Sequence, residues 1–259
     1  SAIFSLFKHL NLESCNIYSP AYLEYKKASL NFGYKLNLIN RFENIDVEVK
    51  KNSLVIFVNP STPDGKYYDL EELMQKWMEN SCTILIDESF LDFCDKPSAI
   101  KYLENYDKLY ILKSMTKFYS SAGIRVGTIV STKENIEKLK EFEPMWKLSQ
   151  FDSNYLQAAL DDKLFKNLSK EINIKNKIEL ENILRNSSLI EEIFESSANY
   201  VLVKLKNLSA KEFQEKLKPY KIMVRDCSNF DYLNSSDVRI AVKSSSANEI
   251  LQRALKEIC

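Results

Sequence analysis

The sequence is poor in several residue types, and each shortage excludes a class of function. Its 259 residues contain one histidine, His9, and four glycines, and its 36 basic side chains are balanced by 36 acidic ones. A single histidine excludes histidine-rich metal sites and argues against a Ser-His-Asp triad. A net charge of zero provides no field that would attract nucleic acid or an anionic membrane. We therefore expect no metal centre, and neither nucleic acid nor a membrane as a partner.

Long apolar runs are also missing, because none approaches the roughly 20 residues that span a bilayer. The first residues, SAIFSLFKHLNLE, form an amphipathic pattern and not a charged leader followed by an apolar stretch, so we expect no signal peptide. The cysteines are odd in number and scattered, which favours reduced thiols in the cytoplasm. They are Cys15, Cys82, Cys94, Cys227 and Cys259.

The remaining composition is that of a globular protein, with 45% hydrophobic and 28% charged residues, enough for one large domain and a smaller one. Up to about residue 131, short apolar runs alternate with helical patterns. This alternation predicts an α/β fold, in which a mostly parallel central sheet is flanked by helices. The candidate strands are 14–20, 35–40, 53–60, 82–88, 108–114 and 124–131, and helical patterns at 22–32 and 69–79 separate several of them.

The second half of the chain has a different pattern. Residues 132–185 are rich in Lys, Glu and Leu with helical periodicity, which predicts long connecting helices. From about residue 196 a smaller α+β pattern follows, with candidate strands at 199–205, 220–227 and 237–244 and helices at 209–217 and 246–258. We therefore expect a large domain over 1–140, connecting helices over 141–190 and a small C-terminal domain over 191–259.

Three candidate strands end in polar or reactive side chains: Asn59, Asp87 and, just after its strand, Lys117. In an open α/β sheet, ligands bind beyond the carboxyl ends of the strands. Each residue has an ordinary alternative, because a loop lysine is usually solvated, an aspartate after a strand often caps a turn, and Asn before Pro is common in turns.

The segments around these residues weaken the ordinary alternatives. VNPSTPDG surrounds Asn59 with two prolines and a glycine, and IDESFLDF buries an apolar strand up to Asp87. LKSMTKFYSSAGIRVG adds Ser114, Thr116 and Arg125 around the lysine, and all three suit an anionic group. Together these are the groups needed to hold a phosphorylated aromatic aldehyde.

The Asn-Pro loop, the DE strand end and the run S-x-[ST]-K…G-x-R-x-G resemble the three linked motifs of fold-type I pyridoxal-phosphate (PLP) enzymes of the class I/II aminotransferase group. The resemblance covers nearly the whole chain. Within the group the sequence is most similar to threonine-phosphate decarboxylases, which are related to histidinol-phosphate aminotransferases. That similarity lies in DESFLDF, SMTKFYSSAGIRVG, SANYVLV and the tail from VRDCSNF to QRAL.

The resemblance implies a role for each residue at the strand ends. Lys117 would form the Schiff base with PLP, and Asp87 would pair with the protonated pyridine nitrogen, which keeps the ring able to accept electrons. Asn59 would donate to the phenolate oxygen of the ring. The other residues implied in cofactor binding are Ser114, Thr116 and Arg125, which would hold the phosphate, and Tyr22, which would stack on the ring unless it is an ordinary core tyrosine.

The resemblance also implies substrate-binding residues in the small domain. Arg239 matches the arginine that binds the substrate carboxylate, and Arg225 matches a second arginine that would bind the anionic end of the substrate. Asn199 would approach the substrate or serve a turn. For both arginines the alternative is a surface position on a strand.

Two features depart from the family pattern. Many aminotransferases carry a tyrosine three residues after the aspartate, and this chain has Phe90 there, which is the decarboxylase-like choice. Relatives also carry an N-terminal arm and a glycine-rich turn before a helix that Ser1–Phe7 already resembles. Either the sequence is a fragment of a longer protein or the protein has lost these parts, and we expect a fragment.

The motifs leave the reaction open. The first hypothesis is decarboxylation of an O-phospho-L-amino acid, threonine or serine phosphate, and the second is an aminotransferase of the histidinol-phosphate type. A third is a non-catalytic scaffold that keeps the fold. Because active sites of the family lie at a two-fold interface, the resemblance also implies a homodimer.

Overall fold

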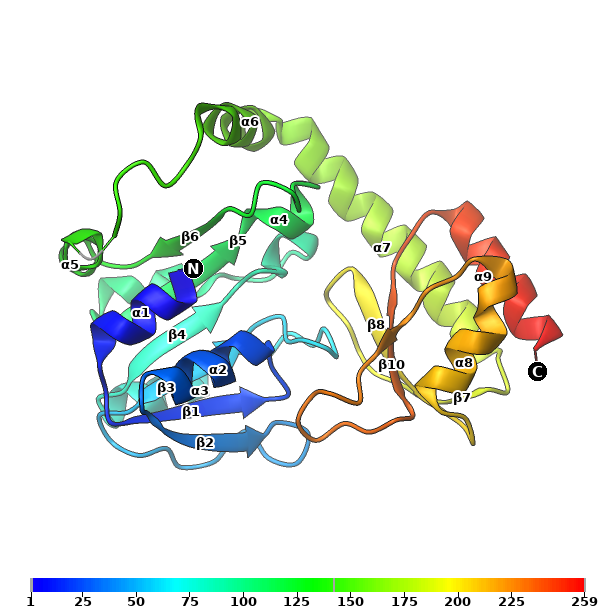
Figure 1. Ribbon diagram of the computed structural model, residues 1–259, viewed down its shortest axis with the longest axis horizontal. Helices are drawn as coiled ribbons and strands as arrows, with labels where there is room; N and C mark the ends of the chain where they lie inside the picture. The colour runs from blue at the N-terminus through cyan, green and yellow to red at the C-terminus, as the bar shows by residue number, and fades with distance from the viewer. Residues whose placement is uncertain (1, 142, 259) are drawn as a thin grey trace.

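The computed structural model describes residues 2–141 and 143–258 and contains two β-sheets (Figure 1). The larger sheet has six strands in the order β2-β1-β3-β4-β5-β6. All pairs in it are parallel except the one between β5 and β6, which is antiparallel. The strands are β1 (Ser14–Ser19), β2 (Lys35–Asn40), β3 (Leu54–Val58), β4 (Thr83–Asp87), β5 (Leu109–Ser114) and β6 (Gly127–Val130).

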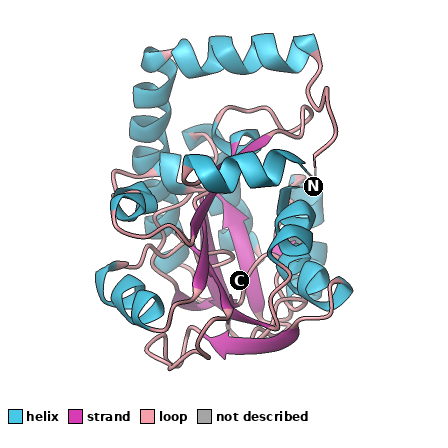
Figure 2. Cartoon of the chain, turned by 90° about the vertical axis from the view of Figure 1, so that its left-hand side faces the viewer, coloured by secondary structure: helices cyan, strands magenta, loops and turns pink. Residues whose placement is uncertain are grey.

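The central strands β3 and β4 are buried along their whole length and mostly apolar, because helices cover both faces of this sheet (Figure 2). In β3, Leu54 and Ile56 pack toward one face and Val55 and Phe57 toward the other, as the two-residue period of a strand requires. The first face is covered by α1 (Ala2–Leu10), α2 (Leu23–Asn31) and α5 (Lys133–Glu141), and the second by α3 (Glu71–Glu79) and the 3₁₀ helix η2 (Ala99–Glu104). Two short helices, η1 (Leu91–Phe93) and α4 (Met115–Phe118), follow β4 and β5 at the carboxyl edge.

The long helices α6 (Gln150–Asp161) and α7 (Lys163–Arg185) lead to the second sheet, whose strand order is β7-β8-β10-β9. Its apolar core lies between the sheet, α7 and two further helices. A capping box of Ser209 and Glu212 begins α8, since each side chain accepts from the other residue's backbone N–H. These elements are β7 (Ile190–Ile193), β8 (Tyr200–Leu205), α8 (Ala210–Leu217), η3 (Lys218–Tyr220), β9 (Arg225–Asp226), β10 (Asp237–Ala241) and α9 (Ser245–Glu257).

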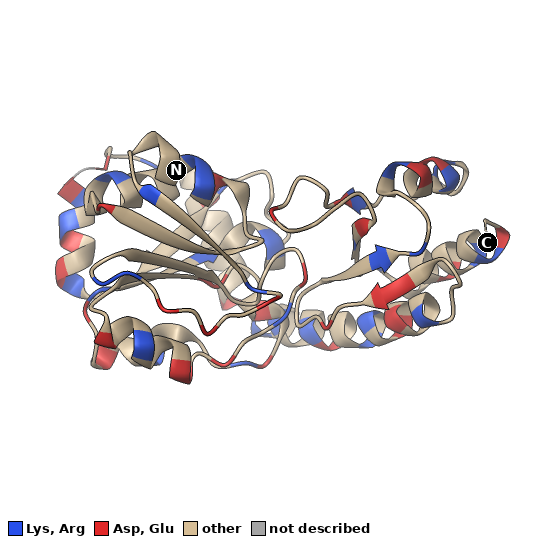
Figure 3. Cartoon of the chain, turned by 90° about the horizontal axis from the view of Figure 1, so that it is seen from below, with Lys and Arg blue, Asp and Glu red and all other residues tan. Residues whose placement is uncertain are grey.

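The two sheets are connected by more than α7. The ammonium of Lys26 on α2 pairs with Asp231 at 2.6 Å, and the hydroxyl of Tyr232 donates to the carbonyl of Leu38 at 3.0 Å. The loop 59–66 also accepts hydrogen bonds from Arg239 and Tyr200 of the small sheet. Basic and acidic residues are intermingled over both parts of the chain, in keeping with the balanced net charge (Figure 3).

The expected fold class is confirmed, and several details differ. The predicted strand 220–227 forms a ladder only at Arg225–Asp226, because Lys221 adopts a left-handed backbone (φ +57°) that ends η3. β7 has mixed polar composition and was not predicted. The domain boundaries at 140 and 190 stay a prediction. Cys259 lies outside the described residues, and the other four cysteines are free thiols.

No helix in the described parts of the chain is both long and apolar enough to cross a bilayer.

Candidate active site

The three predicted strand-end residues meet at one edge of the large sheet. β3, β4 and β5 are neighbours, with Val58 opposite Asp87 and Asp87 opposite Leu112. The backbone N–H of Asn59 donates to the carbonyl of Asp87 at 2.9 Å. Lys117 lies on α4, directly after β5. The carboxyl ends of parallel strands therefore place an amide, a carboxylate and an amine side by side.

Asp87 is 5% exposed, and its carboxylate is held by donors of the chain. Oδ1 accepts from the backbone N–H of Ser89 at 2.9 Å and from the Ser89 hydroxyl. Oδ2 accepts from the hydroxyl of Tyr25 at 2.6 Å. Burial, and next the charge of Asp87, raise the pKa of Tyr25 well above its usual value, so the tyrosine remains a donor. A buried carboxylate with three donors has a fixed orientation.

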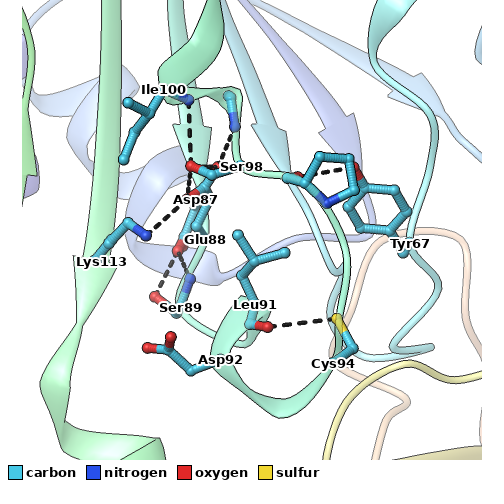
Figure 4. Close-up of polar contacts among 12 residues, drawn as sticks. Tyr67, Asp87, Glu88, Ser89, Leu91, Asp92, Cys94, Ser98, Ile100 and Lys113 are labelled. Atoms are coloured by element: carbon cyan, nitrogen blue, oxygen red, sulfur yellow. Dashed lines mark hydrogen bonds and ion pairs between the residues drawn. The ribbon is translucent and has the colours of Figure 1, made fainter.

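Glu88, the second acid of the strand end, has a different environment. Its carboxylate accepts from the Ser98 hydroxyl and the backbone N–H of Ala99, and it pairs with Lys113 at 3.1 Å (Figure 4). Consecutive residues of a strand point to opposite faces, which separates Glu88 from Asp87. Glu88 therefore holds the start of η2 by hydrogen bonds and pairs with Lys113 on β5.

Lys117 lies among hydroxyl groups next to an aromatic ring. Its ammonium donates to Ser114 Oγ at 2.9 Å, and that oxygen is 2.8 Å from Thr116 Oγ1. The ring centroid of Phe90 is 5.7 Å from the amine. Partial burial lowers the pKa of Lys117, and the nearby charge of Arg125 lowers it further, while the carboxylate of Asp87 opposes both. The amine is thus biased toward its neutral, nucleophilic form and still reaches solvent.

Arg125 lies on the loop that follows α4, and its backbone has a left-handed φ of +52°. Its guanidinium donates to the carbonyl of Ala122 at 3.2 Å. Gly127 fixes this loop against β5, because a Cβ there would lie 2.9 Å from the carbonyl oxygen of Lys113. The close pairing of Ser114 with Gly127 brings the Arg125 loop back to the end of β5.

Asn59 is 1% exposed, and its side chain is fixed by the backbone of Tyr68. One amide N–H donates to the Tyr68 carbonyl, and the amide oxygen accepts from the Tyr68 N–H, both at 2.9 Å. An asparagine amide has two N–H groups, so one remains for another acceptor. This second N–H of Asn59 is available for the predicted hydrogen bond to a ring oxygen.

Tyr22 immediately precedes α2 and is 49% exposed. Its ring contacts Tyr25 edge to face, with the centroids 6.2 Å apart. Tyr22 is therefore connected to Asp87 through Tyr25, whose hydroxyl donates to that carboxylate.

Arg239, on β10 of the small sheet, extends to the loop of Asn59. Its guanidinium donates to Thr62 Oγ1 at 3.2 Å and lies 4.6 Å from the ring centroid of Tyr200. The Tyr200 hydroxyl donates to the carbonyl of Ser61 at 2.7 Å, and its ring meets Phe90 edge to face at 5.0 Å. Arg239 is therefore connected through Tyr200 to the aromatic ring beside Lys117.

The two other predicted substrate residues are also in the small sheet. Arg225 lies directly opposite Arg239 in the β9–β10 ladder, and its guanidinium donates to Asn229 at 2.9 Å. The backbone carbonyl of Asn199 accepts from Val242, while its side-chain Oδ1 is buried with no partner among the described residues. The structure thus gives neither residue a ligand role by itself, and both stay predictions.

Sequence reasoning missed Tyr25, Thr62 and Tyr200. Tyr25 lies in the first turn of α2, three residues after the predicted Tyr22, and this proximity in sequence is the only signal that could have identified it. Thr62 and Tyr200 carry no comparable local signal, because they act through contacts with distant segments.

The side chains at this edge of the large sheet fit the functional groups of PLP. The cofactor has an aldehyde, a pyridine nitrogen, a ring oxygen and a phosphate, and the site offers Lys117, Asp87, the remaining N–H of Asn59, and a group of hydroxyls with a guanidinium. An amine with a lowered pKa next to an oriented, buried carboxylate is the arrangement that the chemistry requires. The fold and the site together therefore place the chain in the class of PLP-dependent enzymes.

The chain belongs to the family described as aminotransferase class I and II, whose sequence model matches residues 10–258. The cofactor that this family indicates is pyridoxal 5'-phosphate. A protein of Caldanaerobacter subterraneus subsp. tengcongensis, provisionally named threonine-phosphate decarboxylase, is 30% identical over 92% of this chain and 69% of its own length. The histidinol-phosphate aminotransferase of Methanocaldococcus jannaschii is 28% identical over 92% of this chain and 63% of its own length.

Among solved structures, the histidinol-phosphate aminotransferase from Clostridium acetobutylicum is 28% identical and superposes with a TM-score of 0.87. The match covers 98% of this chain and 81% of that one. The chain spans about two thirds of the length of the two curated relatives. Relatives at similar identity thus carry the names of two different reactions, and the particular reaction of this chain is a matter for proposal.

Proposed function

We propose that the chain is a PLP-dependent decarboxylase of an O-phospho-L-amino acid, threonine or serine phosphate, which gives an aminoalkyl phosphate and carbon dioxide. The observation that carries the proposal is the pair of arginines, Arg225 and Arg239, opposite each other on neighbouring strands. None of the ion pairs formed by the described residues includes either of them.

Like charges directly opposite in an antiparallel ladder repel one another. An anion bound to both guanidinium groups would relieve that repulsion, and arginine binds carboxylate and phosphate with a planar fork of donors. A phospho-amino acid carries both groups on one small molecule. Arg239 lies against the ring of Tyr200, and Arg225 is more exposed. We infer that Arg239 binds the carboxylate and that Arg225 binds the phosphate.

In this proposal the residues of the large domain hold the cofactor. PLP, when bound, accepts the electrons of the bond that breaks at the substrate Cα. Asp87 holds the pyridine nitrogen and Asn59 the ring oxygen. Lys117 supplies the neutral amine, and after carbon dioxide leaves it can return a proton to Cα. The phosphate would be held by Ser114, Thr116 and Arg125, and the ring would stack on Tyr22.

The choice of reaction depends on orientation, because only a Cα bond perpendicular to the cofactor ring overlaps its π system. Arg239 fixes the carboxylate and thereby the bond that stands upright. Thr62 and Tyr200 in turn fix Arg239, so its position depends on how the small sheet contacts the loop 59–66. The likeness to the Caldanaerobacter protein and the presence of Phe90 favour decarboxylation.

The test is to incubate the chain with PLP and phosphothreonine or phosphoserine and to measure the carbon dioxide released. The expected result is stoichiometric carbon dioxide and aminoalkyl phosphate, with the release lost in Arg239→Gln. Exchange of amino groups that depends on a keto acid, without gas, would exclude the decarboxylase.

The second candidate is an aminotransferase of the histidinol-phosphate type, favoured by the 28% identity to the Methanocaldococcus enzyme. The same arginine pair would then bind the carboxylate of an amino donor and the phosphate of histidinol phosphate in alternate half-reactions. Conversion of bound PLP to its amino form by glutamate alone would support this candidate.

We also propose that the active protein is a homodimer. A set of large apolar side chains is exposed on α6, α7 and the segment before them, where a second copy would cover them. Their exposed fractions are 92% for Trp146, 71% for Phe151, 69% for Leu164 and 56% for Ile172.

A further inference from the structure

The carboxylate of Asp87 keeps one acceptor position after the donors of the chain are counted. A carboxylate has about four lone-pair sites, two on each oxygen. The backbone N–H and the hydroxyl of Ser89 occupy both sites of Oδ1. The hydroxyl of Tyr25 occupies one site of Oδ2, at 2.6 Å. The vacant site is therefore on Oδ2, the oxygen that Tyr25 contacts.

Tyr25 is suited to hold this oxygen. Its side chain is fully buried in the core between α2 and the sheet, and desolvation raises its pKa well above the usual value. The hydroxyl therefore stays protonated and can only donate to Asp87. Tyr22 immediately precedes α2, so the start of this helix places both an exposed aromatic ring and a donor to Asp87.

We propose that Tyr25 is a positioning residue for the cofactor, which donates to Oδ2 of Asp87 and turns the remaining lone pair of that oxygen toward the protonated ring nitrogen of PLP. The inference rests on the proposed pairing of Asp87 with PLP, and it adds the oxygen that makes the pair and the side chain that orients it. A tyrosine that merely fills the core would affect the stability of the fold without acting through Asp87.

A double-mutant cycle separates these two roles, because it measures whether two side chains act through each other. The PLP-free chain is titrated with PLP, and the dissociation constant is measured for the unaltered protein, Tyr25→Phe, Asp87→Asn and the double variant. Loss of one hydrogen bond to a charged group predicts that Tyr25→Phe weakens PLP binding by about tenfold. In the Asp87→Asn background the same change should have no further effect.

Tyr34→Phe is the matched control. Tyr34 is also a buried tyrosine, but its hydroxyl donates to the carbonyl of Phe7 at 2.8 Å and accepts from Leu12. We expect this variant to lower the thermal unfolding midpoint and to leave the PLP dissociation constant unchanged.

A second variant tests the assignment of the oxygen. Ser89→Ala removes a donor from Oδ1 and leaves its backbone donor in place, so it should weaken PLP binding less than Tyr25→Phe does. A larger effect of Ser89→Ala would overturn the assignment to Oδ2. An unchanged dissociation constant in Tyr25→Phe, or the same loss in both backgrounds, would overturn the positioning role. By contrast, an unchanged dissociation constant in Asp87→Asn would overturn the proposed pairing itself.

Discussion

Lys117 gains its reactivity from its immediate surroundings. A solvated lysine is protonated at neutral pH, and a protonated amine cannot attack an aldehyde. Partial burial of Lys117 and the positive charge of Arg125 both disfavour the ammonium form, whereas the negative charge of Asp87 favours it. The hydroxyl of Ser114 keeps the amine beside the phosphate-binding candidates. The same few groups therefore tune the amine and define where a phosphorylated aldehyde would lie.

Replacing Lys117 by alanine should abolish turnover and still allow PLP to bind without a covalent bond. The remaining contacts of Asp87, Asn59 and Arg125 do not need the amine. The assay is product formation together with the absorbance and exchangeability of bound PLP. Lys108→Ala, at the opposite end of β5, is the control and should keep its activity. Normal activity in Lys117→Ala would show that the site is assigned wrongly.

Arg125→Gln should raise the pKa of Lys117. A cation near an ammonium group disfavours the protonated form, so its removal lets the ammonium persist to higher pH. The rate at which an amine-reactive reagent modifies Lys117 in the PLP-free chain, followed by peptide mass spectrometry, should reach its midpoint at a higher pH than in the unaltered protein. Arg185→Gln, at the exposed end of α7, should leave the midpoint unchanged. A midpoint that falls in Arg125→Gln contradicts the electrostatic explanation.

The loop 59–66 couples the two sheets. It begins at Asn59, which is proposed to bind the cofactor, and it contacts two residues of the small sheet and the segment that precedes β8. The Ser61 carbonyl accepts from Tyr200, Thr62 accepts from Arg239, and the Gly65 carbonyl accepts from the backbone of Ser197 at 2.7 Å. The position of Arg239 relative to the cofactor thus depends on the conformation of one short loop.

Gly65 allows this contact, and its replacement by alanine should be costly. Its backbone has φ +84°, and an added Cβ would lie 3.0 Å from Ser196 Cβ and 3.2 Å from Tyr200 Cε2. The backbone strain and the clash together should destabilise the fold by about 3 kcal/mol. Denaturant unfolding of the PLP-free chain provides the measurement.

Gly33→Ala is the control for that prediction. Gly33 also has a positive φ, +74°, but no atom lies within 4 Å of its added Cβ. Only the backbone strain applies, so the free energy of unfolding should fall by about 1 kcal/mol. Equal losses in the two variants would mean that the contact with Ser196 and Tyr200 contributes nothing.

The elements of the site could be predicted from sequence in part. The apolar runs that end at Asp87 and before Asn59 identify buried strands, because a strand covered on both faces must be apolar throughout. The two-residue strand at Arg225 could not be predicted in its true extent, since Met223 has an exposed side chain and Lys221 a left-handed backbone. β-propensity indicates what fits a half-buried sheet, and only the packing decides whether a sheet is there.

The two helices α6 and α7 give the molecule an apolar surface outside both cores. One side of α7 packs on the large domain, where Phe165 contacts Phe118 and Lys170 pairs with Asp95. Leu164 and Leu168, one turn apart, are 69% and 45% exposed. An apolar surface of this kind is typical of an interface between subunits.

Leu164→Glu should therefore convert the proposed dimer into single chains, because a charge buried in an apolar interface is unfavourable. Sedimentation or light scattering gives the mass of the particle. Ile250→Glu, at an isolated exposed apolar residue of α9 (38% exposed), should leave the mass of the dimer unchanged. A single-chain mass for the unaltered protein would contradict the dimer proposal.

The sequence by itself determined the α/β fold class, the family and the candidate residues at the strand ends, because these follow from local periodicity and from motifs a few residues long. Only the tertiary structure decided which side chains hold those residues. Tyr25 and Asp87 are 62 positions apart, and Thr62 and Arg239 are 177 apart. Such contacts form when a helix packs on a sheet or one sheet closes on another, and no local pattern in the chain encodes their geometry.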